Sequence, residues 1–103
     1  MRDTIYEVTA HIRSEEVKTA YLDWLGSGHV QSVLDNGALN AVVTVYEEPG
    51  GWVVESRYMF SSRAEFDAYE AGPAEGLREA GRQRFGDAIT FHRKVGVLAF
   101  RLP

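Results

Sequence analysis

Hydrophobic and polar side chains alternate along residues 4–12, the first patterned stretch of the chain. A period of two places successive side chains on opposite faces of an extended strand. One face of this predicted strand is apolar and carries Tyr6, Val8, Ala10 and Ile12. The other face is mixed and carries Ile5, Glu7, Thr9 and His11. The pattern therefore predicts a strand that buries one face against a core.

Residues 14–37 change to helical spacing. Ser14 is placed to cap the start of a helix. Apolar residues then recur at intervals of three and four and form one stripe: Val17, Ala20, Tyr21, Trp24 and Leu25. The Gly26-Ser27-Gly28 sequence predicts a break, because glycine adopts backbone angles that other residues avoid. We expect a second helical piece after this break, ending at Gly37.

The middle of the chain has the pattern of a hairpin. Residues 38–48 and 52–60 are rich in β-branched and aromatic side chains, and Pro49-Gly50-Gly51 lies between them. Two strand-like runs joined by a short Pro/Gly turn are typical of two adjacent antiparallel strands.

The rest of the chain predicts another helical region and a last strand. Ser62 and Glu65 have the spacing of a capping box at the start of a helix. Pro73 suits the first turn of a further helix, which we expect to end at Gly86. Residues 88–100 then form a strand-like run.

The predicted element order is β-α-β-β-α-β, which is the ferredoxin-like α+β arrangement. Its four antiparallel strands lie in the order 4-1-3-2, with the helices on one face. The other face has no cover of its own and is apolar on either strand parity, through Val53 and Met59 or through Trp52 and Phe60. Because an apolar sheet face is usually covered by a partner, we expect a homodimer that packs sheet against sheet.

Composition limits the classes of partner. The chain has 103 residues and a net charge of −4, with no dense basic stripe. Because phosphate neutralisation provides most of the affinity for nucleic acids, we expect no nucleic-acid partner. No run approaches the roughly 20 apolar residues of a membrane span, and the opening MRDTIYEV lacks a signal-peptide pattern. The absence of cysteine excludes disulfides and thiolate catalysis. We expect a single cytoplasmic domain over residues 1–103, with no membrane partner.

Several segments together resemble a known family of small bacterial proteins. They are the opening IYEVT, the helix W-L-x-x-x-H-V-x-x-V-L-x-x-G from Trp24 to Gly37, the run SRYMFSSRAEFDAY, and RFG at 84–86. With these segments the chain is similar to domain of unknown function 4286. The resemblance implies a dimeric α+β barrel, a superfamily that also holds cofactor-free monooxygenases, haem-degrading enzymes, lactone isomerases and stress-responsive proteins. It implies no activity, because a shared fold does not carry function across.

Polar side chains on the mixed face of the central strands are the first candidate site. Glu7 is expected near Arg57 and Glu55 on one side and near Arg93 on the other. A carboxylate beside a guanidinium can orient a carbonyl-bearing or anionic ligand. Residues that we consider for ligand binding are Glu7, His11, His29, Tyr46 and Arg57. The alternative is that these charges pair with one another, or across the dimer, and fix its register.

His29 is the candidate catalytic residue. Its ordinary pKa of about 6.5 suits a general base. The alternative is that it packs at the helix break. A cofactor-free enzyme would need His29, Tyr46 and Arg57 to face one pocket of roughly 300 Å³ or more. The three histidines lie on different predicted elements, so we expect no metal site, and no motif predicts a cofactor.

Two further groups have ordinary structural interpretations. Tyr21 and Trp24 have core spacing, and Arg78 and Arg82 have glutamates three residues earlier, which is typical of a solvated, salt-bridged helix face. The favoured function is a non-catalytic or small-molecule-binding homodimer, with a cavity between the first helix and the sheet or between two sheets. The alternatives are the cofactor-free enzyme and a protein-interaction module.

Overall fold

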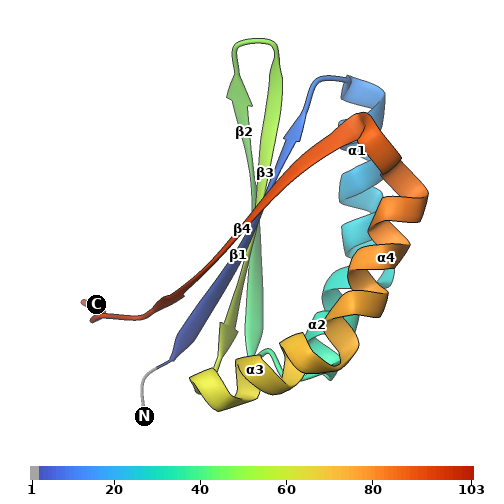
Figure 1. Cartoon of the computed structure of the whole chain (residues 1–103). Helices are drawn as coiled ribbons and strands as arrows, with labels where there is room; N and C mark the ends of the chain where they lie inside the picture. The colour runs from blue at the N-terminus through green and yellow to red at the C-terminus, as the bar shows by residue number, and fades with distance from the viewer. Residues whose placement is uncertain (1–2) are drawn as a thin grey trace.

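Four antiparallel strands form one sheet in the computed structural model, which describes residues 3–103 (Figure 1). The strands are β1 (Thr4–Ile12), β2 (Asn40–Glu48), β3 (Gly51–Phe60) and β4 (Ile89–Val97). Their order is β2-β3-β1-β4, which confirms the predicted order 4-1-3-2 read from the other edge. Strand β1 is central and pairs with β3 on one side and with β4 on the other.

The first helical region has three parts. Helix α1 (Glu15–Trp24) begins after Ser14, whose hydroxyl accepts a hydrogen bond from the backbone N–H of Val17 at 3.3 Å. A π-helical turn, η1 (Leu25–His29), follows, and α2 (Val30–Asp35) completes the region. The predicted break is present, because Gly28 has a φ of 153°, which favours glycine.

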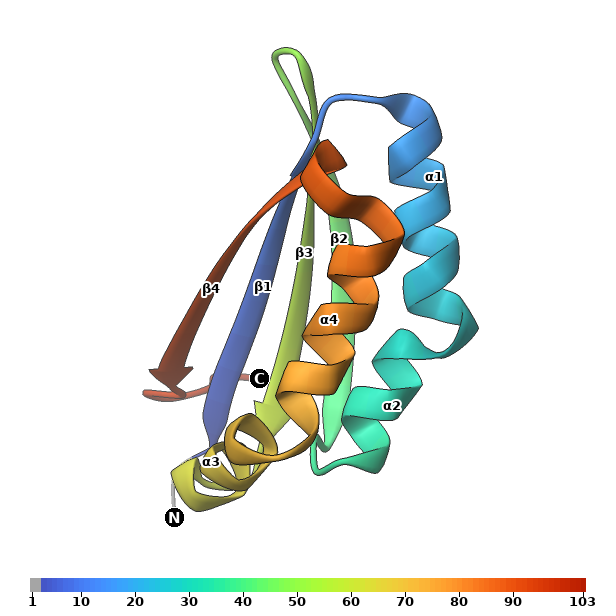
Figure 2. The same cartoon turned by 45° about the vertical axis from the view of Figure 1, so that its right-hand side comes forward.

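The second helical region also has separate parts. Helix α3 (Arg63–Ala71) begins after Ser62, which accepts from the N–H of Glu65 at 3.2 Å and confirms the predicted cap. Helix α4 (Pro73–Phe85) has proline in its first turn, and the short 3₁₀ turn η2 (Gly86–Ala88) leads into β4. All four α-helices lie on the same face of the sheet (Figures 1 and 2).

The core lies between this helical layer and the apolar face of β1. Strand alternation sends every second side chain of β1 and β3 toward the helices. The fully buried aromatic and aliphatic side chains on this face and on the helices above it form two clusters, which include Tyr6, Tyr21, Leu25, Val33, Val54, Tyr58, Phe60, Phe66, Tyr69 and Ile89.

No helix among residues 3–103 lies over the opposite face of the sheet (Figure 1). The register of β1 and β3 decides which parity lies there: Val53 and Met59 face the open side, while Phe60 is buried under the helices. No helix among residues 3–103 combines the length and apolar character that a membrane crossing requires.

Candidate functional site

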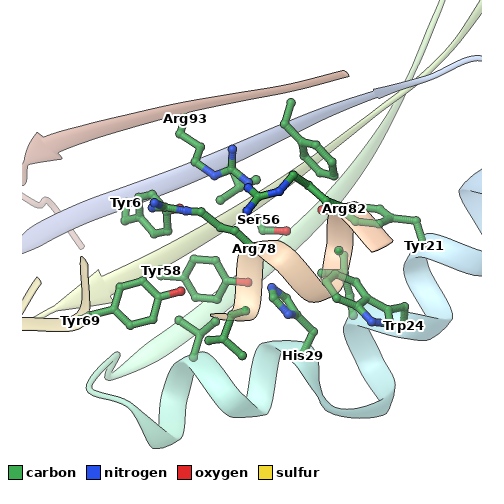
Figure 3. A pocket seen from close by; sticks show the side chains of 16 residues that line it. Tyr6, Tyr21, Trp24, His29, Ser56, Tyr58, Tyr69, Arg78, Arg82 and Arg93 are labelled. Carbon is green, nitrogen blue, oxygen red and sulfur yellow. The ribbon is translucent and has the colours of Figure 1, made fainter. Parts of the chain in front are cut away.

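A cavity of about 140 Å³ lies between the helices and the covered face of the sheet. Side chains from β1, β3, β4, α1, η1, α2, α3 and α4 surround it (Figure 3). Its sixteen lining residues are Tyr6, Val8, Tyr21, Trp24, Leu25, His29, Val33, Ser56, Tyr58, Tyr69, Leu77, Arg78, Gly81, Arg82, Phe91 and Arg93. This is one of the two locations that the sequence predicts for a cavity.

The sheet leaves room for the cavity at one row of side chains. In the register of the strands, Val8 of β1 lies between Ser56 of β3 and Arg93 of β4. Ser56 and Val8 are small, whereas the neighbouring row pairs Tyr6 with Tyr58. The small side chains of Val8 and Ser56, next to this row of large rings, leave space beneath the helices.

The helical wall also has a small residue at the cavity. A Cβ on Gly81 of α4 would lie 3.3 Å from the indole of Trp24, closer than ordinary van der Waals contact. Gly81 therefore lets α4 approach the Trp24 ring.

Aromatic rings form one wall of the cavity. The rings of Trp24 and His29 are stacked, with centroids 4.0 Å apart and planes 20° from parallel. Phe85 meets Trp24 edge-on at 5.6 Å, and Tyr21 lies beside Trp24 at 6.0 Å. Tyr21 is buried as predicted, but Trp24 is only partly buried and faces the cavity. The sequence interpretation of Trp24 as simple core is therefore incomplete.

Arg78 reaches into the cavity wall, which contradicts the predicted solvated helix face. Its two terminal nitrogens donate to the carboxylate of Glu70 at 2.7 and 2.6 Å, and one of them also donates to the hydroxyl of Tyr6 at 3.0 Å. These hydrogen bonds raise the pKa of Arg78 and lower the pKa of Glu70 from their ordinary values. Arg82 follows the prediction more closely, because it pairs with Glu75 and Glu79, both at 2.6 Å.

Two buried side-chain atoms among residues 3–103 have no hydrogen-bond partner, and both belong to residues that line the cavity. They are the hydroxyl oxygen of Ser56 and the Nε of Arg78. Tyr21 and Tyr58 approach the Ser56 hydroxyl, but neither forms a hydrogen bond of good geometry with it. Ser56 is 1% exposed. An unsatisfied buried polar atom costs stability, and native structures contain few of them.

The cavity shifts the pKa values of its titratable groups away from neutrality. Burial, with help from the charge of Arg93, lowers the pKa of His29 to about 4. Burial raises the pKa of Tyr21 and of Tyr69 to about 12, and it also raises the pKa of Tyr58. At neutral pH these groups are uncharged and act as hydrogen-bond donors or acceptors.

The structure divides the sequence-predicted site residues between two faces. His29 lies at the cavity, whereas Glu7, His11, Tyr46 and Arg57 lie on the open face of the sheet. The pocket that would hold His29, Tyr46 and Arg57 together is therefore not formed within one chain. The cavity that is present is also smaller than the roughly 300 Å³ expected of it.

Three of the candidate residues on the open face have polar partners. Arg57 lies 3.7 Å from the carboxylate of Glu7, and His11 lies 3.2 Å from the carboxylate of Glu48. The expected neighbour of Glu7 on β4 is corrected: the register places Lys94 opposite Glu7, and Arg93 opposite Val8 on the covered face. The expectation misjudged the register by one residue, and such a shift moves a side chain to the other face.

Sequence reasoning missed four residues that define the cavity: Ser56, Arg78, Gly81 and Arg93. Two of them, Arg78 and Gly81, had a signal in the sequence. They share one helix face with Ala74 and Leu77, at intervals of three and four. Among residues 3–103, no group of three or more histidines and carboxylates is placed to hold a metal ion.

Solved structures with the same fold have low sequence identity to this chain. A dimeric ferredoxin-like protein from an uncultured marine organism has a TM-score of 0.75 at 15% identity, over 99% of this chain and 100% of that chain. A second dimeric ferredoxin-like protein from an uncultured marine organism has a TM-score of 0.72 at 11% identity, over 100% and 93%. A monooxygenase from the gene ActVA-Orf6 of Streptomyces coelicolor, in complex with nanaomycin D, has a TM-score of 0.73 at 11% identity, over 99% and 92%. At these identities the likeness shows the fold alone.

The family comparison agrees with the sequence resemblance. A search of curated proteins found no match to this chain. The family model for domain of unknown function DUF4286 matches residues 3–97, which includes every helix and strand of the fold. The chain therefore belongs to the DUF4286 family.

Proposed function

We propose that this protein is a homodimer that binds a small molecule in the cavity beneath α1 and α4. The observation that carries this proposal is the cavity itself, about 140 Å³ in volume and walled by aromatic rings. An engineered apolar cavity of about 150 Å³ binds benzene, so this volume accommodates one aromatic ring. Trp24 and His29, with the rings of Tyr21 and Tyr58, give the cavity an aromatic lining against which such a ring can pack.

We place binding ahead of catalysis because the cavity lacks a group suited to proton transfer at neutral pH. General acids and bases work best when their pKa lies near the working pH. The pKa of His29 is about 4, and those of Tyr21 and Tyr69 are about 12. These groups suit the recognition of a ligand better than the movement of its protons.

Binding is tested by titrating the ¹⁵N-labelled protein with benzyl alcohol, a neutral single-ring probe, and following the backbone amides by NMR. We expect shifts at Ser56, Tyr58 and Gly81 and none at Thr44 or Tyr46 on the open face. Shifts confined to the open face, or no saturable shift anywhere, would contradict a binding cavity beneath the helices.

Two alanine variants on helix α4 provide a matched control for this titration. Gly81→Ala presses on the Trp24 ring and should weaken binding. Gly76→Ala points into open space and should leave binding unchanged.

The homodimer is proposed from the apolar side chains that the single chain leaves exposed. On the open face, Val42 is 57% and Tyr46 50% exposed. Phe100 and Leu102, both 76% exposed, follow β4 in the C-terminal segment, which leaves the sheet on its helix-free side (Figure 1). Several exposed apolar side chains on one face are typical of a protein contact. The two structural relatives described as dimeric support the same association.

A charge introduced on the open face should separate the two subunits. Val42→Glu places a carboxylate in the proposed interface, and we expect light scattering at micromolar concentration to measure a monomer instead of the wild-type dimer. Val43→Glu is the matched control, since Val43 is the next residue of β2, points to the helical side and is also exposed. A wild-type monomer, or a dimer that Val43→Glu disrupts and Val42→Glu does not, would contradict this interface.

A further inference from the structure

Three hydrogen-bond donors at the cavity have no carboxylate partner. The Ser56 hydroxyl and the Arg78 Nε–H are buried without partners, and the guanidinium of Arg93 makes no ion pair among residues 3–103. Figure 3 shows Ser56, Arg78 and Arg93 reaching the same space from β3, α4 and β4. All three residues line the cavity.

The side chains that carry a charge in the cavity lining are all positive. No aspartate or glutamate is among the sixteen lining residues, which include three arginines. Glu70 occupies the terminal nitrogens of Arg78 but leaves its Nε free. Glu75 and Glu79, 73% and 49% exposed, hold Arg82 from the solvent side. Arg93 makes no ion pair with a carboxylate among residues 3–103, and Glu70, whose pKa its charge helps to lower, is bound to Arg78.

A carboxylate fits this set of donors better than a neutral group does. It presents two oxygens that only accept hydrogen bonds, so it can satisfy the Ser56 hydroxyl and the Arg78 Nε–H together. Hydrogen bonds from a charged donor to a charged acceptor are the stronger kind. The cavity volume limits the remainder of the ligand to about one ring.

We propose that the ligand is a single-ring aromatic carboxylate, with its carboxylate held by Ser56, Arg78 and Arg93 and its ring against Trp24. This inference rests on the proposed binding function and names its ligand class. Arg93, which is exposed, stands at the mouth of the cavity, and Ser56 and Arg78 lie deeper.

The test compares benzoate with benzyl alcohol, which has the same ring and no charge. NMR titrations of the wild-type protein should give benzoate an affinity at least about tenfold higher than that of benzyl alcohol. Arg93→Gln should lower the benzoate affinity about tenfold more than it lowers the benzyl alcohol affinity. Arg84→Gln is the matched control, because Arg84 is exposed, makes no ion pair among residues 3–103 and does not line the cavity.

The outcomes separate the two proposals. Equal affinity for the two probes, or an equal loss of benzoate binding in Arg93→Gln and Arg84→Gln, would overturn the carboxylate site and leave the binding cavity in place. If neither probe shifts the amides around Ser56, both the carboxylate site and the proposed binding function are wrong. Preference for benzoate that depends on Arg93 and not on Arg84 supports both.

Discussion

Replacing Trp24 with alanine is expected to lower the free energy of unfolding by about 3 kcal/mol and to abolish binding of single-ring ligands. Trp24 contacts three rings: it is stacked on His29 at 4.0 Å, and it also lies against Tyr21 and Phe85. Removing the indole merges its volume with a cavity that is already present. The estimate is at the lower end of the range for buried aromatic residues because Trp24 is partly exposed.

Trp52→Ala is the control for this prediction, and urea denaturation measures both variants. Trp52 is at the start of β3, where its ring lies under the Lys18 ammonium at 4.8 Å, and it does not line the cavity beneath the helices. We expect its loss to cost about 1 kcal/mol and to leave ligand binding unchanged. Equal losses of stability in the two variants would contradict the role of Trp24 as a wall of both core and cavity.

Local patterns predicted the fold because each element has its own sequence signal. The period of two in β1, the Ser14 and Ser62 caps and the glycine break at Gly28 are all present in the structure. These signals depend on a few neighbouring residues and on backbone geometry, so a single sequence carries them. Strand order then followed from the known arrangement of β-α-β-β-α-β chains.

The site was harder to predict because it depends on contacts between distant parts of the chain. Arg78 pairs with Glu70 of the preceding helix and with Tyr6 of the first strand, not with the glutamate three residues before it. Placing Arg93 on the covered face required the register between β1 and β4, and the sequence pattern does not determine that register to within one residue. Four polar residues on the open face are candidates from the sequence, yet three of them already have partners: Glu7 and Arg57 pair with each other, and His11 contacts Glu48.

Ser56 shows most clearly why the site was harder to predict than the fold. A serine between Glu55 and Arg57 on a strand carries no distinctive sequence signal, and only the packed structure reveals that its hydroxyl is buried without a partner. A side chain that costs stability in the unliganded protein is expected where binding requires it. We therefore expect the Ser56 hydroxyl to lower the stability of the unliganded protein and to raise its affinity for the ligand.

Valine and threonine at position 56 separate these effects, because the two side chains have nearly the same shape and differ by a methyl group in place of the hydroxyl. We expect Ser56→Val to be about 2 kcal/mol more stable than Ser56→Thr, since valine removes the unsatisfied hydroxyl and threonine retains it.

The benzoate affinity should follow the reverse order, with the valine variant at least about tenfold weaker than the threonine variant. Urea denaturation and NMR titration of the same two proteins measure both quantities. If threonine is the more stable variant, the Ser56 hydroxyl has a partner within the fold and is no longer available to a ligand. If stability behaves as expected but both variants bind benzoate equally, the hydroxyl is a packing defect, and Arg78 and Arg93 alone would have to hold the carboxylate.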